Sequence, residues 1–177
     1  THGVHEVAHV EFRADVFFRQ HLAARAQRVG ALVDDLGGQR YVRGDDEITG
    51  NAYLTTHDPN GDVLYGVDVF VDPDYRDMRL GRRLYEARKE LCRSLNLRAI
   101  VAGGRIPNYK QHADKMSPQQ YIEAVKHKEL YDPILTFQLN NDFEVKRILT
   151  GYLPEDRESR GYATLLEWTN IYYDHSR

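Results

Sequence analysis

The chain has 177 residues, of which 41% are hydrophobic and 29% charged, and its net charge is −3. This length suits one domain with a single sizeable core. No stretch approaches the roughly 20 apolar residues of a membrane span, and none resembles a signal peptide. The only cysteine, Cys92, rules out an intrachain disulfide. We therefore expect a cytoplasmic protein that does not contact a membrane.

The charge is unevenly distributed along the chain. Between Arg76 and Arg93 there are seven Lys/Arg against three Asp/Glu, a local balance of +4 that leaves −7 for the rest. General binding of nucleic acid needs a broad basic face, which this chain does not offer. One compact basic patch favours a small polyanion as ligand. The alternative is a solvated helix face with intrahelical ion pairs such as Glu86 with Lys89.

The first third of the chain is predicted to begin with a helix. Apolar residues recur at near-helical spacing from Glu11 to Leu36, and Gly37-Gly38 would end that helix. Residues 39–43 are predicted to form a short strand. Residues 57–62, with Pro59 and Asn60-Gly61, are predicted to form a turn. Residues 1–46 are thus expected to be an N-terminal helical segment.

The middle of the chain contains the clearest pattern, a strand, a helix and a second strand. In the strand 63–71, three valines should lie on one face, with Asp68 and Phe70 on the other. An apolar stripe from Leu80 to Leu95 predicts a helix. Residues 97–104 read as the second strand. Short connections make this a βαβ unit, whose two strands should be parallel neighbours.

The last third is predicted to contain two helices followed by two strands. Ser117, Pro118 and Gln120 form the pattern of a capping box at the start of a helix over 117–130. A second helix is expected over 132–139, and strands over 143–149 and 163–168. The chain is therefore predicted to be α/β with a mixed sheet.

The segment between the first of the two βαβ strands and its helix has the features of an anion site. A helix N-terminus offers unpaired N–H groups and the positive end of the helix dipole. Gly81 would allow close approach of a ligand to the backbone, and guanidinium groups can bond phosphate oxygens in pairs. The combination of these features predicts a pyrophosphate-binding site. Four arginines flank it: Arg76, Arg79, Arg82 and Arg83.

Residues 76–81, Arg-Asp-Met-Arg-Leu-Gly, resemble the acetyl-CoA motif R/Q-x-x-G-x-G/A of the GNAT superfamily of N-acetyltransferases. Arg79 stands where the first glycine of that motif usually lies. Four further stretches, HDPNGDVLYGVDVFVDPDYR, AGGRIPNY, KELYDPILTFQL and ESRGYATLLEW, resemble a bacterial GNAT branch often fused ahead of a carbon–nitrogen hydrolase domain. The resemblance covers roughly residues 47–170. It implies that 47–177 form a GNAT-like mixed β-sheet flanked by helices, in one structural domain with the first 46 residues.

The resemblance also implies the donor and its contacts. The donor would be acetyl-CoA or another acyl-CoA, with no metal. Backbone N–H groups near Phe70 and Val71 would serve the pantetheine and the thioester carbonyl. The remaining cofactor contacts would come from Arg76, Met78, Arg79, Leu80, Gly81 and Arg82.

The mechanism that the family suggests is direct attack of an amine on the thioester in a ternary complex. Such chemistry needs a base for the ammonium and an acid for the thiolate. Asp68 is the candidate base, directly or through water, if burial beside Phe70 raises its pKa; its alternative role is that of a solvated strand residue. Gln138 falls in the place of the family's acid tyrosine. Tyr131, two turns earlier, is the candidate acid, with simple packing as the alternative.

The acceptor is expected to be a small-molecule or protein amine. The stretch 105–114, with Arg105 and Tyr109, is predicted to line its pocket because it follows the second βαβ strand. The competing reading is a GNAT-like module that binds acyl-CoA without catalysis, as a sensor or a partner of a hydrolase subunit. A homodimer or association with a hydrolase domain is left open, and no nucleic-acid partner is expected.

One competing motif, His5-Glu6-x-x-His9, matches the H-E-x-x-H pattern of zinc peptidases. It lies next to the start of the sequence and lacks a glycine–histidine continuation. His21, Asp34 or Asp35 could provide a third ligand, but nothing singles one out. We therefore expect two solvent-facing histidines and no metal site.

Overall fold

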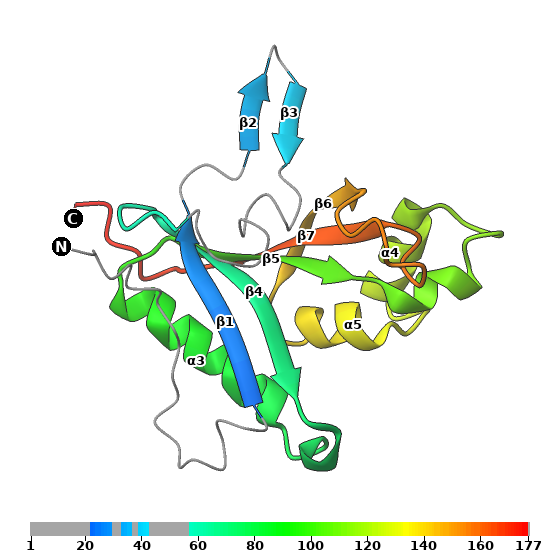
Figure 1. Ribbon diagram of the computed structural model, residues 1–177, viewed down its shortest axis with the longest axis horizontal. Coiled ribbons are helices and arrows are strands. Elements are labelled where there is room, and N and C mark those ends of the chain that lie inside the picture. The colour runs from blue at the N-terminus through cyan, green and yellow to red at the C-terminus, as the bar shows by residue number, and fades with distance from the viewer. Residues whose placement is uncertain (1–21, 30–32, 37–38, 43–56, 177) are drawn as a thin grey trace. The chain divides into compact units, whose positions relative to one another are not determined.

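The computed structural model describes residues 57–176 in full and the backbone of residues 22–29, 33–36 and 39–42. Seven strands and three α-helices lie in these ranges, with two short 3₁₀ turns at Pro73–Tyr75 and Pro107–Gln111 (Figure 1). In chain order the strands and helices are β1 (Leu22–Val29), β2 (Val33–Leu36), β3 (Gln39–Val42), β4 (Val63–Val71), α3 (Leu80–Ser94), β5 (Ala99–Arg105), α4 (Pro118–Lys126), α5 (Pro133–Leu139), β6 (Glu144–Thr150) and β7 (Tyr162–Thr169).

The strands form a five-stranded sheet in the order β1-β4-β5-β7-β6 and a two-stranded sheet of β2 and β3. The pairs β1–β4, β2–β3 and β6–β7 are antiparallel. Strands β4 and β5 are neighbours joined through α3, which is the crossover of a βαβ unit and requires them to be parallel. The mixed α/β sheet predicted from the sequence is confirmed.

The chain divides into two compact units, and the division falls within β5. Unit 1 comprises Thr1–Leu32, Ile48–Ile100 and Thr169–Arg177. Unit 2 comprises Val33–Glu47 and Val101–Trp168. Each unit has its own buried apolar side chains.

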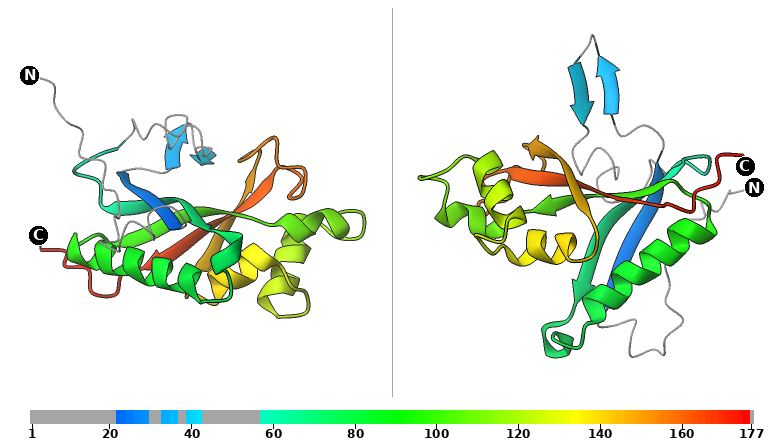
Figure 2. Two further views of the ribbon diagram at one scale, coloured as in Figure 1. Left: turned by 60° about the horizontal axis from the view of Figure 1, so that its bottom comes forward. Right: turned by 180° about the vertical axis from the view of Figure 1, so that it is seen from behind.

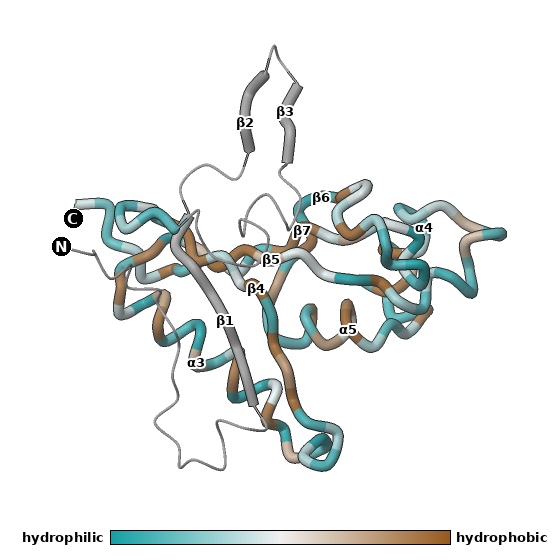
Figure 3. The backbone as a smooth tube through the Cα atoms, in the orientation of Figure 1, coloured by the Kyte–Doolittle hydropathy of each residue, from teal (hydrophilic) through white to brown (hydrophobic). Residues whose placement is uncertain are grey.

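The core of unit 1 forms between β4 and α3, which pack against each other (Figure 2). The first four residues of β4 are buried, and the remainder of the strand is half-buried or exposed. Helix α3 contributes its apolar stripe, whose hydrophobic segments recur along the helix in Figure 3. The buried members of this stripe are Leu80, Leu84, Tyr85 and Cys92. Burial of this stripe is the main reason that the segment is helical.

Strand β4 contains a β-bulge in its register with β1. Arg25 is paired with Asp68, but the next residue, Ala26, is paired with Gly66. Val67 is therefore the extra residue on β4. Because a bulge re-aims the residues beside it, the regular alternation that the sequence predicts for this strand is interrupted directly before Asp68.

In unit 2, two glycines of β5 allow large side chains to lie against the strand backbone. A Cβ at Gly103 would come within 2.1 Å of the Tyr152 ring. A Cβ at Gly104 would come within 2.5 Å of the Gln138 side-chain oxygen and of a Leu166 methyl group. Neighbouring strand residues point to opposite faces. Hence the glycine pair lets β5 be covered closely by Tyr152 on one face and by Gln138 on the other.

The predicted helix from Glu11 to Leu36 is wrong where the structure describes it. Residues 22–29 and 33–36 are the strands β1 and β2, and eight residues of β1 pair with β4. The near-helical spacing of the apolar residues is a local signal, which the hydrogen bonds of a distant partner strand override. Residues 11–21 and Gly37-Gly38 lie outside the described residues. The strand predicted for 39–43 is confirmed as β3.

Most of the other predicted elements are confirmed within one or two residues. Strand 63–71 is β4, and the capping box of Ser117 with Gln120 is present at the start of α4. That helix ends at Lys126 rather than at residue 130. The turn predicted over 57–62 is closed by a hydrogen bond from the Gly61 N–H to the Asp58 carbonyl, at 3.0 Å.

Candidate functional site

The N-terminus of α3 is entered through the segment 72–79, here called the entry loop. Asp72 begins it by accepting a hydrogen bond from the Asp74 N–H, at 3.0 Å. Two of its non-glycine residues, Asp77 and Arg79, have the left-handed φ angles of 63° and 57°. Arg79 is the N-cap residue of α3, and its side chain makes no capping hydrogen bond. The first N–H groups of α3 therefore receive no side-chain oxygen from their own cap.

Four arginines surround this helix end, and all four are exposed: Arg76, Arg79, Arg82 and Arg83. Arg76 donates from Nε to the Val71 carbonyl at 3.4 Å, the limit of a hydrogen bond. Within the described part of the chain, no ion pair or hydrogen bond engages the other three guanidinium groups. This arginine cluster and the helix dipole together favour binding of a multiply charged anion.

In the second half of α3, charged side chains form ion pairs within the helix. Lys89 pairs with Glu86 at 3.0 Å, and Arg93 pairs with Glu90 at 2.8 Å. The intrahelical ion pairs of the alternative are thus present in this half of the helix, although Lys89 is buried and does not belong to a solvated face. These pairs do not account for the arginine cluster at the other end.

Apolar side chains lie within the entry loop and directly beside it in sequence. Phe70 at the end of β4 is 50% exposed and Met78 is 62% exposed. Leu80, in contrast, is buried, so only its backbone could meet a ligand. Exposed apolar groups beside a cationic helix end suit a ligand with both a phosphate part and a less polar part.

Asp68 lies in the half-buried second part of β4. Its backbone carbonyl accepts a hydrogen bond from the guanidinium of Arg88, which projects from α3. The Arg88 side chain is almost fully buried, and burial lowers its pKa, while the charges of Tyr85 and Asp68 oppose that shift. This contact of Arg88 was not predicted from the sequence. The sequence nevertheless contained a sign that Arg88 is buried. Arg88 lies four residues after Leu84 and four residues before Cys92, and this spacing places it on the apolar stripe of α3.

Tyr131 and Gln138 belong to unit 2. Tyr131 lies before α5, next to the N-cap residue Asp132, and its side chain is 66% exposed. It is therefore not on the helix that carries Gln138, contrary to the expectation from the sequence. Gln138 is buried on α5, and its side-chain oxygen has no hydrogen-bond partner in the part of the chain that the structure describes.

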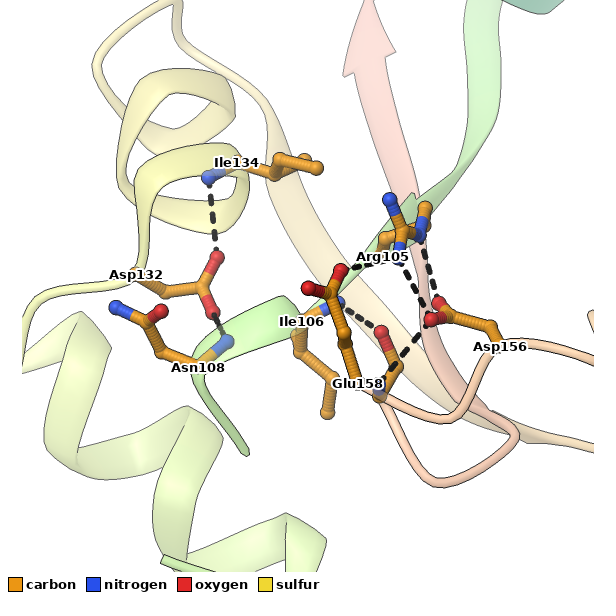
Figure 4. A network of polar contacts seen from close by, with 8 residues as sticks. Arg105, Ile106, Asn108, Asp132, Ile134, Asp156 and Glu158 are labelled. Carbon is orange, nitrogen blue, oxygen red and sulfur yellow. Dashed lines mark hydrogen bonds and ion pairs between the residues drawn. The ribbon is translucent and has the colours of Figure 1, made fainter. Parts of the chain in front are cut away.

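Arg105 and Tyr109 are both engaged within unit 2. Arg105 donates two hydrogen bonds to Asp156, at 2.6 and 2.7 Å, and one to Glu158 at 2.8 Å (Figure 4). Tyr109 is buried and donates to the Met116 carbonyl at 3.2 Å. Burial is the main reason that the pKa of Tyr109 is raised. These contacts hold the stretch after β5 in place.

A second buried polar group in unit 2 is Asp132. Its carboxylate accepts from the N–H groups of Ile134 and Leu135, from the N–H of Asn108 and from the Tyr121 hydroxyl, at 2.8 to 3.1 Å. Burial and this bond raise the pKa of Tyr121. All of these partners are within the unit. The bonds to Ile134 and Asn108 are drawn in Figure 4, and the arrangement caps α5 and joins it through Tyr121 to α4.

Neither a metal site nor a membrane span is found among the described residues. No group of three or more His, Cys, Asp and Glu side chains could hold a metal ion there. None of the helices in that part of the chain has the length and hydrophobicity of a bilayer span. The motif His5-Glu6-x-x-His9 lies outside the described residues, so its assignment remains a prediction.

The sequence of residues 5–113 matches the model of the acetyltransferase (GNAT) family. The chain belongs to this family. The resemblance to the GNAT superfamily that was drawn from the sequence is thus confirmed.

Two curated relatives come from Bacillus subtilis (strain 168). The "Probable hydrolase YhcX" is 51% identical over 127 residues, which are 72% of this chain and 25% of that protein. The "Uncharacterized N-acetyltransferase YkwB" is 38% identical over 127 residues, 72% of this chain and 56% of that protein. The chain therefore spans about a quarter and about half of these relatives. The first of them agrees with the expected resemblance to a GNAT branch that occurs with hydrolases.

Solved structures with the same fold confirm the predicted GNAT architecture. The loading GNATL domain of CurA from Lyngbya majuscula has a TM-score of 0.70 at 22% identity, over 84% of this chain and 70% of that one. The GphF GNAT-like decarboxylase in complex with isobutyryl-CoA has a TM-score of 0.62 at 24% identity, over 84% and 71%. At these identities the likeness concerns the fold.

Proposed function

We propose that this chain is an N-acyltransferase that transfers an acetyl or other acyl group from acyl-CoA to an amine. The observation on which the proposal chiefly rests is the start of α3, where three exposed arginines have no partner among the described residues beside an uncapped helix end. Together with membership of the GNAT family, this fits the pyrophosphate of a CoA thioester.

In the proposed complex, each part of the donor has a matching group in unit 1. Arg76, Arg79 and Arg82 bind the phosphates, with backbone N–H groups near Gly81. The exposed side chain of Met78 and the backbone of Phe70, Val71 and Leu80 line the less polar part of the donor.

The proposed chemistry is direct attack in a ternary complex. The amine nitrogen bonds to the thioester carbonyl carbon, the carbon–sulfur bond breaks, and CoA leaves as a thiolate that takes up a proton. Asp68 is proposed as the base that receives the ammonium proton, directly or through water. Tyr131 stays the candidate acid, and its side chain is exposed to solvent.

We propose that Arg105 and Tyr109 support the acceptor pocket and do not touch the acceptor themselves. Their polar atoms already bind partners in unit 2, namely Asp156, Glu158 and the Met116 carbonyl. The acceptor itself is proposed to be a primary amine, on a small molecule or on a protein.

The test is release of free thiol from acetyl-CoA in the presence of a panel of primary amines, with the Asp68→Asn variant beside the wild type. Asp68→Asn keeps the size of the side chain and removes the base, so kcat should fall roughly 10²–10⁴-fold. The Kd for CoA, measured by calorimetry, should change less than about threefold, because no phosphate contact is altered.

Asp74→Asn is the matched control, since it neutralises an exposed carboxylate of the entry loop. It should leave kcat unchanged. CoA binding without thiol release for any amine would favour the non-catalytic acyl-CoA-binding module. An Asp68→Asn variant with the wild-type rate from pH 6 to pH 9 would remove Asp68 from the mechanism.

A further inference from the structure

The buried guanidinium of Arg88 is the feature of unit 1 that the packing of α3 does not explain. Arg88 is only 4% exposed, at a position of the apolar stripe where a leucine would pack without a desolvation penalty. A buried charge of this kind is retained only where it is hydrogen-bonded. The Arg88 guanidinium donates to the backbone carbonyl of Asp68 on β4.

The place on β4 that Arg88 contacts is the bulge. Val67 is the extra residue relative to β1, and Asp68 follows it directly. A bulge interrupts the ladder of hydrogen bonds between two strands, so the carbonyl groups beside it need other donors to keep a fixed direction. Arg88 is such a donor, supplied from the helix.

The position of Arg88 also connects two parts of the proposed site. Its helix, α3, begins at Leu80 with the arginine cluster, and Arg88 lies about two turns further on. Three residues after the carbonyl that it binds, β4 ends at Val71. A side chain that joins the helix to the bulge therefore holds the phosphate-binding helix end and the reacting end of β4 in one arrangement.

We propose that Arg88 is a positioning residue that holds the bulge of β4, and with it the Asp68 side chain and the Phe70–Val71 backbone, in the geometry required for acyl transfer. This inference rests on the proposed function. The titratable groups that act on the Arg88 guanidinium include Tyr85 on its own helix and Asp68 on β4.

The variants Arg88→Met and Arg88→Lys test the proposal. Methionine fills the stripe and donates no hydrogen bond, so kcat should fall roughly 10–100-fold, the usual effect of a displacement of about 1 Å near reacting groups. The KM for acetyl-CoA should stay within about threefold, since the arginine cluster is intact. Lysine restores a cationic donor and should recover a measurable part of the lost kcat.

Cys92→Ala is the control for loss of packing. Cys92 is buried one turn further along the same stripe, and its thiol donates to the Leu97 carbonyl at 3.4 Å. It should leave kcat within about twofold of wild type despite a loss of stability. A kcat in Arg88→Met within twofold of wild type would overturn the proposal, as would equal losses of kcat in the Cys92→Ala and Arg88→Met variants.

Backbone amide NMR spectra give a readout that does not depend on activity. The shifts caused by Arg88→Met, or by Arg88→Lys if the first variant does not fold, should concentrate on residues 66–71. If the wild type releases no thiol with any amine, the proposed acyl transfer fails, and these spectra still decide whether Arg88 holds the bulge. Unchanged shifts at 66–71 would refute that role.

Discussion

Arg79 is the residue at which this chain departs from the motif of its family, and the backbone shows why glycine is usual there. Its φ and ψ of 57° and 21° are left-handed. This conformation costs a residue with a side chain roughly 1–2 kcal/mol, whereas glycine adopts it freely. The chain retains an arginine in spite of that cost, which is consistent with a contact between the guanidinium and a phosphate.

The variant Arg79→Gly should therefore distinguish the effect of the backbone conformation on stability from the effect of the charge on CoA binding. We expect its free energy of unfolding, measured by urea titration, to rise by up to about 1 kcal/mol. Glycine removes the cost of the left-handed conformation in the folded state, but it also gives the unfolded chain more freedom, which offsets part of the gain. The affinity of this variant for CoA should fall about fivefold through loss of one charged contact.

Arg79→Ala is the matched control, because it removes the charge and keeps the conformational cost. It should bind CoA like the glycine variant and be less stable than that variant. Wild-type affinity in both variants would mean that Arg79 does not contact the phosphates. Equal stability of the two would mean that the left-handed conformation costs nothing here.

At the scale of elements, the loop between β6 and β7 is tied to β5 by two acidic residues. Asp156 and Glu158 both bind Arg105, at 2.6 to 2.8 Å. The neighbouring Ser159 hydroxyl accepts from the Ile106 N–H at 3.0 Å, and the Glu158 carbonyl accepts from the Lys110 N–H at 3.0 Å. Side chains and backbone thus hold the loop against the stretch that follows β5.

This connection predicts a dependence of stability on pH. The hydrogen bonds from Arg105 hold the pKa of Asp156 well below its ordinary value. A carboxyl whose pKa is lower in the folded state stabilises the fold above its unfolded pKa of about 3.9, and that stabilisation is lost as pH falls below it. Asp156→Asn should thus destabilise the protein at pH 7 and have a smaller effect near pH 2.5, where part of the stabilisation has been lost.

The expected loss at pH 7 is about 1–2 kcal/mol, since the Arg105 side chain is 39% exposed and solvent screens the pair. Urea titrations of wild type and variant at the two pH values give the measurement. Glu155→Gln, an exposed neighbour in the same loop, should change neither value. An equal loss in Asp156→Asn at both pH values would show that the effect is one of packing and not of charge.

At the scale of the whole molecule, residues assigned to the proposed reaction occur in both units. The arginine cluster and Asp68 belong to unit 1, and Arg105, Tyr109 and Tyr131 belong to unit 2. In the proposed reaction, unit 1 provides the groups for the donor and unit 2 provides the stretch that leads to the acceptor.

The absence of a metal is a prediction for the whole molecule. A zinc peptidase site needs a third ligand, which nothing beside His5-Glu6-x-x-His9 identifies. Protein prepared without chelator should therefore contain well below one zinc per chain by elemental analysis. Stoichiometric zinc that is lost in His5→Ala, with His2→Ala as the control, would show that this motif binds metal.

The sequence alone determined the features that depend on neighbours in the chain. The turn at Gly61, the capping box at Ser117 and the apolar stripe of α3 are local patterns, and each predicted its element. The cofactor motif is local in the same sense, because phosphate binding at a helix end needs only a few consecutive residues. It was therefore sufficient to predict the family, while the anion site at the start of α3 stays a prediction.

Only the tertiary structure decided the features that depend on distant partners. The segment 22–29 is a strand because β4 supplies its hydrogen bonds, and no periodicity within the segment reports that partner. The sequence placed Arg105 in the acceptor pocket and assigned no role to Arg88, whereas the structure shows that Arg105 binds Asp156 and that Arg88 binds the carbonyl of Asp68 beside the bulge of β4. Burial and pairing are properties of groups brought together by folding, so they cannot be read from the order of residues.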